Sequence, residues 1–229
     1  MYGRGLLFDV GANRGDATTA ALHKGYEKII ALEPAPKMFS LLSRAFIYNS
    51  RVVPLRFAVS DTNNEIIEFY ECVEDGLSSM EKGWLTDPSM PYNGKPYRTI
   101  SAITCTLDWL IEQYGNPDLV KIDVEGAESQ VLAGLTKKPK AICLEWTIET
   151  IDQHVEQLGR LKEVNGYIEY CLQYITPYLD DPSFAYRNIE DPSELKDWIA
   201  ETQDWWTKIG WKQEGRLRPT ADVGMLWVR

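Results

Sequence analysis

The sequence lacks the patterns that mark several common classes of protein. It has four cysteines in 229 residues, and none of them stands in the close CxxC or CxxH spacing of a zinc site. No apolar run approaches the roughly 18–20 residues that a membrane-spanning helix needs. The first residues also lack the succession of regions that forms a secretory signal peptide. We therefore expect no structural zinc site, no membrane span and no secretory leader.

Positive charge is also scarce. The chain has 24 Lys and Arg against 34 Asp and Glu, which gives a net charge of −10. A protein that binds the phosphate backbone needs clustered Lys and Arg, and no such stripe occurs. We therefore expect no nucleic-acid partner and a small-molecule ligand instead.

The four cysteines are distant from one another in sequence, and three of them lie in apolar runs typical of strands. Such positions favour free buried thiols, which are typical of proteins in a reducing cytoplasm. The sequence leaves open one or two disulfides. The four positions are Cys72, Cys105, Cys143 and Cys171.

Apolar runs alternate with helical patterns from the start of the chain. Strands are expected at 5–10, 28–32 and 51–60, with helices at 16–24 and 36–49 between them. This alternation predicts an α/β fold with a doubly wound, mostly parallel sheet. The pattern of residues 65–72 indicates a hairpin-type insertion. Later strands are expected at 98–106, 119–123, 141–146, 167–174 and 225–228, and helices at 107–114, 127–135, 150–164 and 192–208.

Acidic residues gather where the expected strands end. Ligands of open α/β sheets bind beyond the carboxyl ends of the strands. A single acid at such a place has a simpler explanation as a helix cap or a turn residue. Five of them together predict a binding site. They are Asp9, Glu33, Asp61, Asp123 and Glu145.

The loop after the first strand does not match either common phosphate-binding motif. Residues 11–15, GANRG, fit neither GxGxxG nor GxxxxGK[ST]. This disfavours a dinucleotide and a nucleoside triphosphate. A small loop followed by Glu33 suits a nucleoside without phosphate, because that carboxylate can accept hydrogen bonds from both ribose hydroxyls.

Several motifs occur in a fixed order along the chain. They are FDVGAN at 8–13, EP at 33–34, AVSD at 58–61, TLD at 106–108, KIDVEGAE at 121–128, VLAG at 131–134 and LE at 144–145. In this order they resemble the FkbM family of S-adenosylmethionine-dependent methyltransferases. The resemblance covers roughly residues 7–146 and is weaker beyond them.

The resemblance implies a class I methyltransferase fold, Rossmann-like, with a seven-stranded sheet whose last strand is antiparallel. Residues 166–174 and 225–228 would supply the last strand pair. It implies S-adenosyl-L-methionine as cofactor and a hydroxyl group of a sugar, polyketide or similar molecule as methyl acceptor. The implied cofactor residues are Asp9, Val10, Gly11, Ala12, Asn13, Thr18, Glu33, Pro34, Ser60, Asp61 and Asp123.

A neutral alcohol is a poor nucleophile, so a base or a metal ion is expected near the acceptor. Three alternatives remain for Asp123 and Glu125. They form a base with an orienting acid, or a divalent metal site together with Glu145, or Glu125 or Glu128 caps the following helix. His154 is a further candidate base, and its alternative is a solvated histidine.

The long segment 73–97 has no clear periodicity, and long loops in compact domains are often functional. Its GLSSM stretch resembles a serine-bearing stretch of the family, so Ser78 and Ser79 are candidate substrate residues. Trp84, with Tyr92 and Tyr97, forms either an aromatic wall for the acceptor or an anchor that tucks the loop down.

The combined expectation is a single domain over residues 1–229, with insertions at 73–97 and 177–211 on the acceptor side. The expected function is S-adenosylmethionine-dependent O-methylation of a small molecule or glycan, foremost a sugar, in the cytoplasm. The alternatives are a nicotinamide-dependent oxidoreductase and a non-catalytic cofactor-binding module. The chain begins almost inside its first strand, which indicates a minimal version of the fold or a part of a larger multidomain protein.

Overall fold

The structure is a computed structural model that describes residues 5–74, 76–174, 186–208 and 223–229. The chain divides into two compact units, Met1–Ile142 and Cys143–Arg229, here called the N-terminal and C-terminal units. Of the expected insertion at 177–211, residues 177–185 and 209–211 lie outside the described residues.

The N-terminal unit is built on four parallel strands. They are β1 (Leu6–Val10), β2 (Lys28–Leu32), β3 (Val52–Leu55) and β7 (Leu119–Ile122), in the spatial order β7-β1-β2-β3. Phe8 of β1 pairs with Ile30 on one side and Val120 on the other. Parallel strands are covered on both faces, which explains why these strands are nearly continuous apolar runs.

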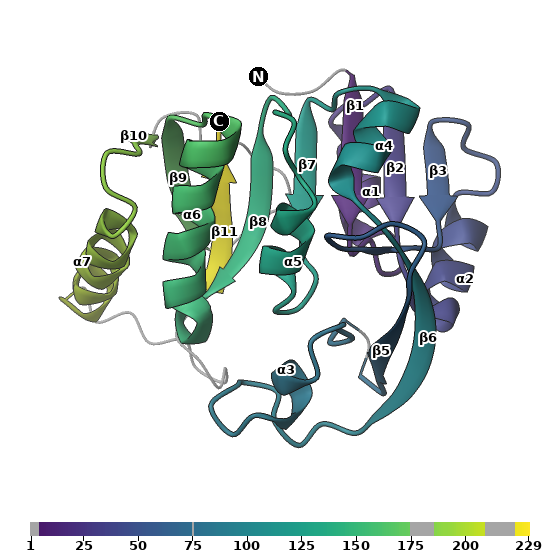
Figure 1. Ribbon diagram of the computed structural model, residues 1–229, viewed down its shortest axis with the longest axis horizontal. Coiled ribbons are helices and arrows are strands. Elements are labelled where there is room, and N and C mark those ends of the chain that lie inside the picture. The colour runs from purple at the N-terminus through teal and green to yellow at the C-terminus, as the bar shows by residue number, and fades with distance from the viewer. Residues whose placement is uncertain (1–4, 75, 175–185, 209–222) are drawn as a thin grey trace. The chain divides into compact units, whose positions relative to one another are not determined.

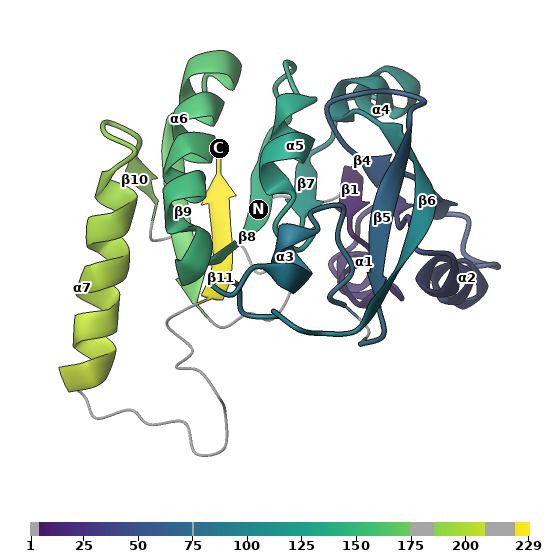
Figure 2. The same ribbon diagram turned by 60° about the horizontal axis from the view of Figure 1, so that its bottom comes forward.

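Helices lie on both faces of this sheet. Figure 2 shows α1 (Asp16–His23) and α2 (Pro36–Ala45) on one face, and α4 (Leu107–Tyr114) and α5 (Glu128–Ala133) on the other. The hydroxyl of Thr106 caps α4 by accepting a hydrogen bond from the backbone of Trp109. Helix α2 begins at Pro36, but it ends at Ala45, four residues before the expected end. This arrangement confirms the doubly wound α/β architecture.

A second, three-stranded sheet was only partly foreseen. Its strands are β4 (Ala58–Val59), β5 (Ile66–Cys72) and β6 (Tyr97–Cys105), in the order β4-β6-β5. The expectation of one strand over 51–60 is wrong, because β4 leaves β3 and pairs with β6. The expected hairpin is confirmed, since β5 and β6 are antiparallel. Figure 1 shows this hairpin and α3 (Gly83–Thr86) beyond the carboxyl ends of β1 and β2.

The C-terminal unit contains four strands in the order β10-β9-β11-β8. They are β8 (Ile142–Thr147), β9 (Glu169–Tyr174), β10 (Arg187–Asn188) and β11 (Val223–Val228), and β8 begins on the last residue of the N-terminal unit. Between them lie η1 (Ile148–Thr150), α6 (Ile151–Asn165) and α7 (Glu194–Lys208). The antiparallel pairing of β9 with β11 confirms the expected last strand pair. The two-residue β10 is one strand more than the expected seven.

All four cysteines are free and buried, which agrees with the first of the two alternatives left open by the sequence. Within the described residues, no helix is both long enough and apolar enough to cross a membrane.

Gly11 fixes the turn that joins β1 to the following loop. Its φ is +74°, and a Cβ at this position would lie 1.8 Å from the carbonyl oxygen of Asp123. An alanine therefore meets both backbone strain and a steric clash, and we expect Gly11→Ala to lower the free energy of unfolding by more than about 2 kcal/mol. Urea denaturation measures this effect.

Gly83→Ala is the matched control, because nothing lies within 4 Å of the Cβ position at Gly83. We expect it to change the free energy of unfolding by less than about 1 kcal/mol. Equal stabilities of the two variants would contradict the close approach of Gly11 to Asp123.

Candidate active site

The loop after β1 is tied to the end of β2. The backbone amides of Gly11 and Ala12 both donate to the carbonyl oxygen of Leu32, at 3.1 and 2.9 Å. Asn13 follows with a positive φ of 50°, a conformation that asparagine tolerates better than most residues. The loop thus brings its backbone beside Glu33, the first residue after β2.

The Glu33 carboxylate is held by this loop. One oxygen accepts from the backbone amide of Asn13 at 2.9 Å, and the other accepts from that of Ala35 at 2.8 Å. The side chain is 6% exposed. Burial raises the pKa of Glu33 to about 7, although the two amides and the charge of Lys121 act in the opposite direction. Each oxygen keeps a further lone pair with which it can accept a hydrogen bond from a ligand.

The Asn13 side chain also has unused hydrogen-bonding capacity. Its amide oxygen is buried and has no partner among the described residues. A Cβ placed on Gly76 would lie 3.5 Å from its amide nitrogen, so the segment after β5 passes close to this loop. An orphaned buried acceptor beside Glu33 is a feature that a polar ligand would satisfy.

Asp9 and Thr18 were expected to line the cofactor, but their side chains contact each other and not the surface. Asp9 is 0% exposed and accepts a hydrogen bond from the Thr18 hydroxyl at 2.6 Å. Its second oxygen lies 3.3 Å from the ammonium of Lys121. Direct contact of either residue with a cofactor stays a prediction, and this burial favours a positioning role.

Lys121 is the residue that the sequence reasoning missed. Its ammonium lies 3.3 Å from both Asp9 and Asp123, and it donates to the carbonyl oxygen of Gly11 at 3.0 Å. Burial alone would lower the pKa of Lys121, but the charges of Asp123 and Asp9 outweigh it and raise this pKa above its usual value. The signal available in the sequence was a lysine inside the apolar run LVKI, where a charged residue is unusual. In the structure this lysine stands opposite Asp9 in the parallel pairing of β1 and β7.

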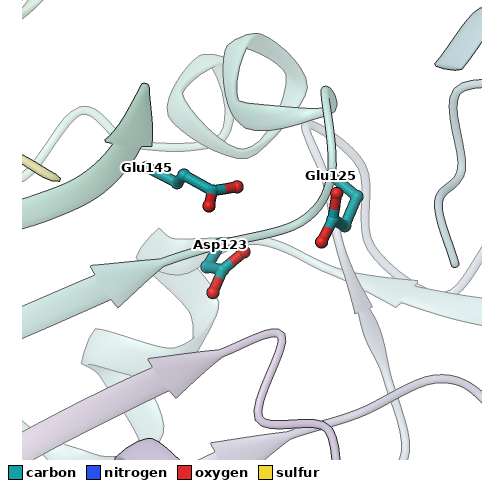
Figure 3. Close-up of side chains that lie close together, drawn as sticks. All are labelled: Asp123, Glu125 and Glu145. Atoms are coloured by element: carbon teal, nitrogen blue, oxygen red, sulfur yellow. The ribbon is translucent and has the colours of Figure 1, made fainter. Parts of the chain in front are cut away.

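Asp123 and Glu125 come together, although not for the reason expected. Strand β7 ends at Ile122, and Glu125 has a φ of 57°, so the strand does not persist to Glu125. The turn nevertheless brings one carboxylate oxygen of each residue within 4.8 Å of the other. Figure 3 shows both side chains on the segment that follows β7.

The Glu125 carboxylate is oriented by an indole. The Trp84 ring nitrogen donates to it at 2.9 Å. Burial, and then the negative charge of Asp123, raise the pKa of Glu125 well above its usual range, and the bond from Trp84 acts in the opposite direction. A carboxylate with a raised pKa is a stronger base once it has lost its proton.

Glu128, a candidate cap of the following helix, bonds instead to the turn that precedes α5, and this helix has no side-chain cap. Its carboxylate is buried and accepts from the backbone amides of Val124 and Gly126 at 3.2 and 3.4 Å. Burial raises its pKa to about 7, despite these bonds. Glu128 therefore stabilises the turn before α5, whereas Glu125 bonds to Trp84.

The candidate substrate residues on the long segment differ in exposure. The Ser79 hydroxyl is buried and lies 3.4 Å from the carbonyl oxygen of Val124, whereas the partly buried Ser78 accepts from the backbone of Cys72. Trp84 is 4% exposed and packs with Tyr70, Cys72 and Leu85. Of the two alternatives for this tryptophan, the structure favours the anchor, and an acceptor contact stays a prediction.

The remaining cofactor candidates lie at or just after the carboxyl ends of β1, β2 and β4. Ser60 is buried and donates to the exposed Asp61 at 3.0 Å. Val10, Ala12 and Pro34 are buried where β1 and β2 end.

The other two catalytic candidates belong to the C-terminal unit. His154 is 2% exposed; its Nε2 lies 2.8 Å from the Thr150 hydroxyl, and its Nδ1 lies 2.9 Å from Gln157. Burial lowers the pKa of His154 to about 4. The expectation of a solvated His154 is therefore wrong, and the burial of this side chain also disfavours its role as a catalytic base. Glu145 is partly buried on β8, and Figure 3 labels it as well.

The importance of Lys121 can be tested by removing its charge. Lys121→Met leaves Asp9 and Asp123 without their buried counter-charge, so we expect a loss of about 3–5 kcal/mol in the free energy of unfolding. Urea denaturation at neutral pH measures it. The control Lys140→Met removes an exposed ion pair with Asp118 and should cost less than about 1 kcal/mol. A Lys121→Met protein as stable as the control would contradict the role of this lysine.

Comparison with known proteins agrees with the motifs on which the site is built. The family described as Methyltransferase FkbM domain matches residues 9–187. The hexuronic acid methyltransferase AglP of Haloferax volcanii is 31% identical over 145 residues, which cover 60% of this chain and 52% of that protein. The chain thus spans about half the length of this curated relative.

Solved structures are similar at a lower level. Precorrin-6y C5,15-methyltransferase from Geobacter metallireducens has a TM-score of 0.46 at 12% identity, with 100% of this chain and 82% of that chain covered. Precorrin-8w decarboxylase from Methanobacterium thermoautotrophicum has a TM-score of 0.43 at 11% identity, with 98% and 81% covered. These values indicate nothing about the ligand. By the match of its own residues 9–187, the chain belongs to the FkbM methyltransferase domain family.

Proposed function

We propose that the protein is an S-adenosylmethionine-dependent O-methyltransferase whose acceptor is a sugar hydroxyl. The observation that carries this proposal is the Glu33 carboxylate, held by two backbone amides at the end of β2 beside the loop 11–15. The edge of an α/β sheet is where such folds bind ligands, and this carboxylate can still accept two hydroxyl donors there.

The residues present fit this cofactor. Glu33 would hold the ribose, and the orphaned amide oxygen of Asn13 would accept a donor from the amino-acid half. Asp61 is exposed at the same edge and would accept a hydrogen bond from the adenine amino group. When bound, S-adenosylmethionine supplies a methyl group on a positively charged sulfur, which the acidic edge favours electrostatically.

Glu125 is the base in this proposal, and Asp123 its orienting partner. In its ionised form, Glu125 takes the proton of the acceptor hydroxyl while the oxygen attacks. Trp84 fixes the orientation of the carboxylate through its 2.9 Å hydrogen bond. Lys121 lies 3.3 Å from Asp123, and the negative charge of Asp123 favours the protonated form of Glu125. The charge of Asp123 therefore stabilises the proton that Glu125 takes from the acceptor hydroxyl.

A divalent ion at Asp123 and Glu125 is the second candidate for activating the hydroxyl. Carboxylate oxygens suit magnesium, but Lys121 already compensates the charge of Asp123. The proposal therefore uses no ion. Methyl transfer that persists after treatment with a chelator supports a reaction without an ion. If the chelator abolished methyl transfer and magnesium restored it, an ion would replace Glu125 as the activating group.

Sugar as the acceptor class is supported by the name of the Haloferax volcanii relative, a hexuronic acid methyltransferase. Gly76 lies beside Asn13 of the loop 11–15, and Ser79 contacts the carbonyl oxygen of Val124, so we place the acceptor on the side of the segment 73–97. The single-domain organisation and the cytoplasmic location belong to the same proposal. A nicotinamide-dependent oxidoreductase has no support from the comparisons. Cofactor binding without turnover on any glycan would favour the non-catalytic module.

Cofactor binding should depend on pH through Glu33. Ribose hydroxyls donate to the ionised carboxylate, so binding weakens as the pH falls below the Glu33 pKa of about 7. We expect the Kd of S-adenosylhomocysteine to rise about tenfold between pH 8 and pH 6, where the ligand's own groups do not titrate. Isothermal titration measures it. Glu33→Gln should bind at least about tenfold more weakly at pH 8, with a flat profile. If the Kd of Glu33→Gln depended on pH as strongly as that of the wild type, Glu33 would be ruled out as the source of the pH dependence.

Glu125→Gln tests the base. We expect the rate of methyl transfer to fall about 100-fold or more, because the amide cannot take a proton, while the Kd of S-adenosylhomocysteine changes less than about threefold. Release of S-adenosylhomocysteine with a panel of glycans measures the rate. The wild-type rate should rise with pH, since only ionised Glu125 is active. Glu112→Gln, an exposed acid on α4, is the control. A Glu125→Gln enzyme with half the wild-type rate would assign the proton to another group.

A further inference from the structure

The turn that carries Glu125 has an unusual backbone. Glu125 and Gly126 both have a positive φ, of 57° and 91°. Glycine adopts this left-handed region freely, whereas a glutamate is uncommon there. Such a conformation persists only where the surrounding structure enforces it. The contacts around this turn therefore decide where the Glu125 side chain lies.

Glu128 holds the turn from the first residue of α5. Its Oε1 accepts hydrogen bonds from the backbone amides of Val124 and Gly126, at 3.2 and 3.4 Å. These two residues are the neighbours of Glu125 in the chain. Glu128 is itself only 4% exposed. One buried oxygen therefore binds the backbone on both sides of Glu125.

Ser79 and Trp84 contact the same turn through other atoms. The Ser79 hydroxyl lies 3.4 Å from the carbonyl oxygen of Val124, and the Trp84 indole donates to the Glu125 carboxylate at 2.9 Å. The Trp84 ring also packs closely on Gly126, because a Cβ at that position would lie 2.7 Å from the ring. The indole can thus meet the carboxylate only while the turn keeps its present conformation.

A base must lie within hydrogen-bond reach of the proton that it takes. A misplacement of about 1 Å can cost about 100-fold in rate, even when the substitution that causes it is not at the reacting atoms. Glu128 is enclosed by the protein, and its Oε1 is occupied by two amides. Any effect of Glu128 on the reaction therefore passes through the position of Glu125.

We propose that Glu128 is a positioning residue for the methyl transfer, whose Oε1 fixes the turn so that the Glu125 carboxylate meets the acceptor hydroxyl. Both of its donors are uncharged backbone amides, so the place of this oxygen matters more than the charge of the side chain. The inference rests on the proposed function, because Glu125 is the base of that reaction.

Two substitutions separate the place of the oxygen from the charge. Glu128→Gln keeps an oxygen at the same reach and removes the charge, whereas Glu128→Asp keeps the charge and withdraws the oxygens by one methylene. With the panel of glycans, we expect Glu128→Asp to lower kcat at least about 30-fold. Glu128→Gln should restore kcat to within about fivefold of the wild type. Neither should change the Kd of S-adenosylhomocysteine more than about threefold.

The Trp84 indole reports the position of Glu125 without any acceptor. In ¹H–¹⁵N spectra of the ¹⁵N-labelled full chain, its Nε1–H resonance is identified by its loss in Trp84→Phe. Glu128→Asp should shift this resonance upfield, towards its position in Glu125→Ala, because the hydrogen bond from the indole weakens. Glu128→Gln should leave it at the wild-type position. A side chain that only stabilises the fold would not move this resonance.

Glu112→Asp is the matched control, because it shortens an exposed acid on α4 by the same methylene, and it should keep both the rate and the indole resonance. A Glu128→Asp protein that keeps either of them, or a Glu128→Gln protein that loses either, would overturn the inference. Failure of the proposed function has a different signature. Glu125→Gln would then keep the wild-type rate, while the indole resonance still reports whether Glu128 orients Glu125.

Discussion

A buried positive charge organises the acidic edge of the sheet. Lys121 lies inside the core between Asp9 and Asp123, and it also donates to the carbonyl oxygen of Gly11. Neither Lys121 nor Asp9 would be stable in the core alone, because an isolated buried charge costs several kcal/mol. Together they join β1, β7 and the loop 11–15 into one unit. This charged cluster fixes where the loop meets Glu33.

The acids that Lys121 does not contact directly have a different electrostatic state. Burial raises the pKa of Glu33 to about 7, and it raises that of Glu125 well above its usual range. Glu33 therefore titrates near neutral pH, and Glu125 holds its proton to a higher pH than an ordinary acid does. In the proposed reaction, Glu33 uses its ionised form to hold a ribose, and Glu125 uses it to accept a proton. In this proposal, the same edge of the sheet contains both structural and reactive acids.

The alternation of apolar runs and helices was sufficient to predict the parallel sheet, because β1, β2 and β7 are buried on both faces. It was not sufficient for residues 51–60, since two short strands of different sheets are adjacent in sequence. For the site, a place at a strand end identified Asp123, but it could not show that Asp9 is buried. Lys121 was missed because its pairing with Asp9 is a tertiary contact. Trp84 and His154 are both buried, which their residue types alone could not indicate.

A crystal structure of the protein with S-adenosylhomocysteine tests the central claim most directly. The account predicts that both ribose hydroxyls lie within hydrogen-bond distance of the Glu33 carboxylate, with the amino-acid half beside Asn13 and the adenine towards Asp61. It also predicts that Lys121 keeps its contacts with Asp9 and Asp123. A ligand bound elsewhere, or a Glu33 carboxylate that makes no contact with it, would contradict the account.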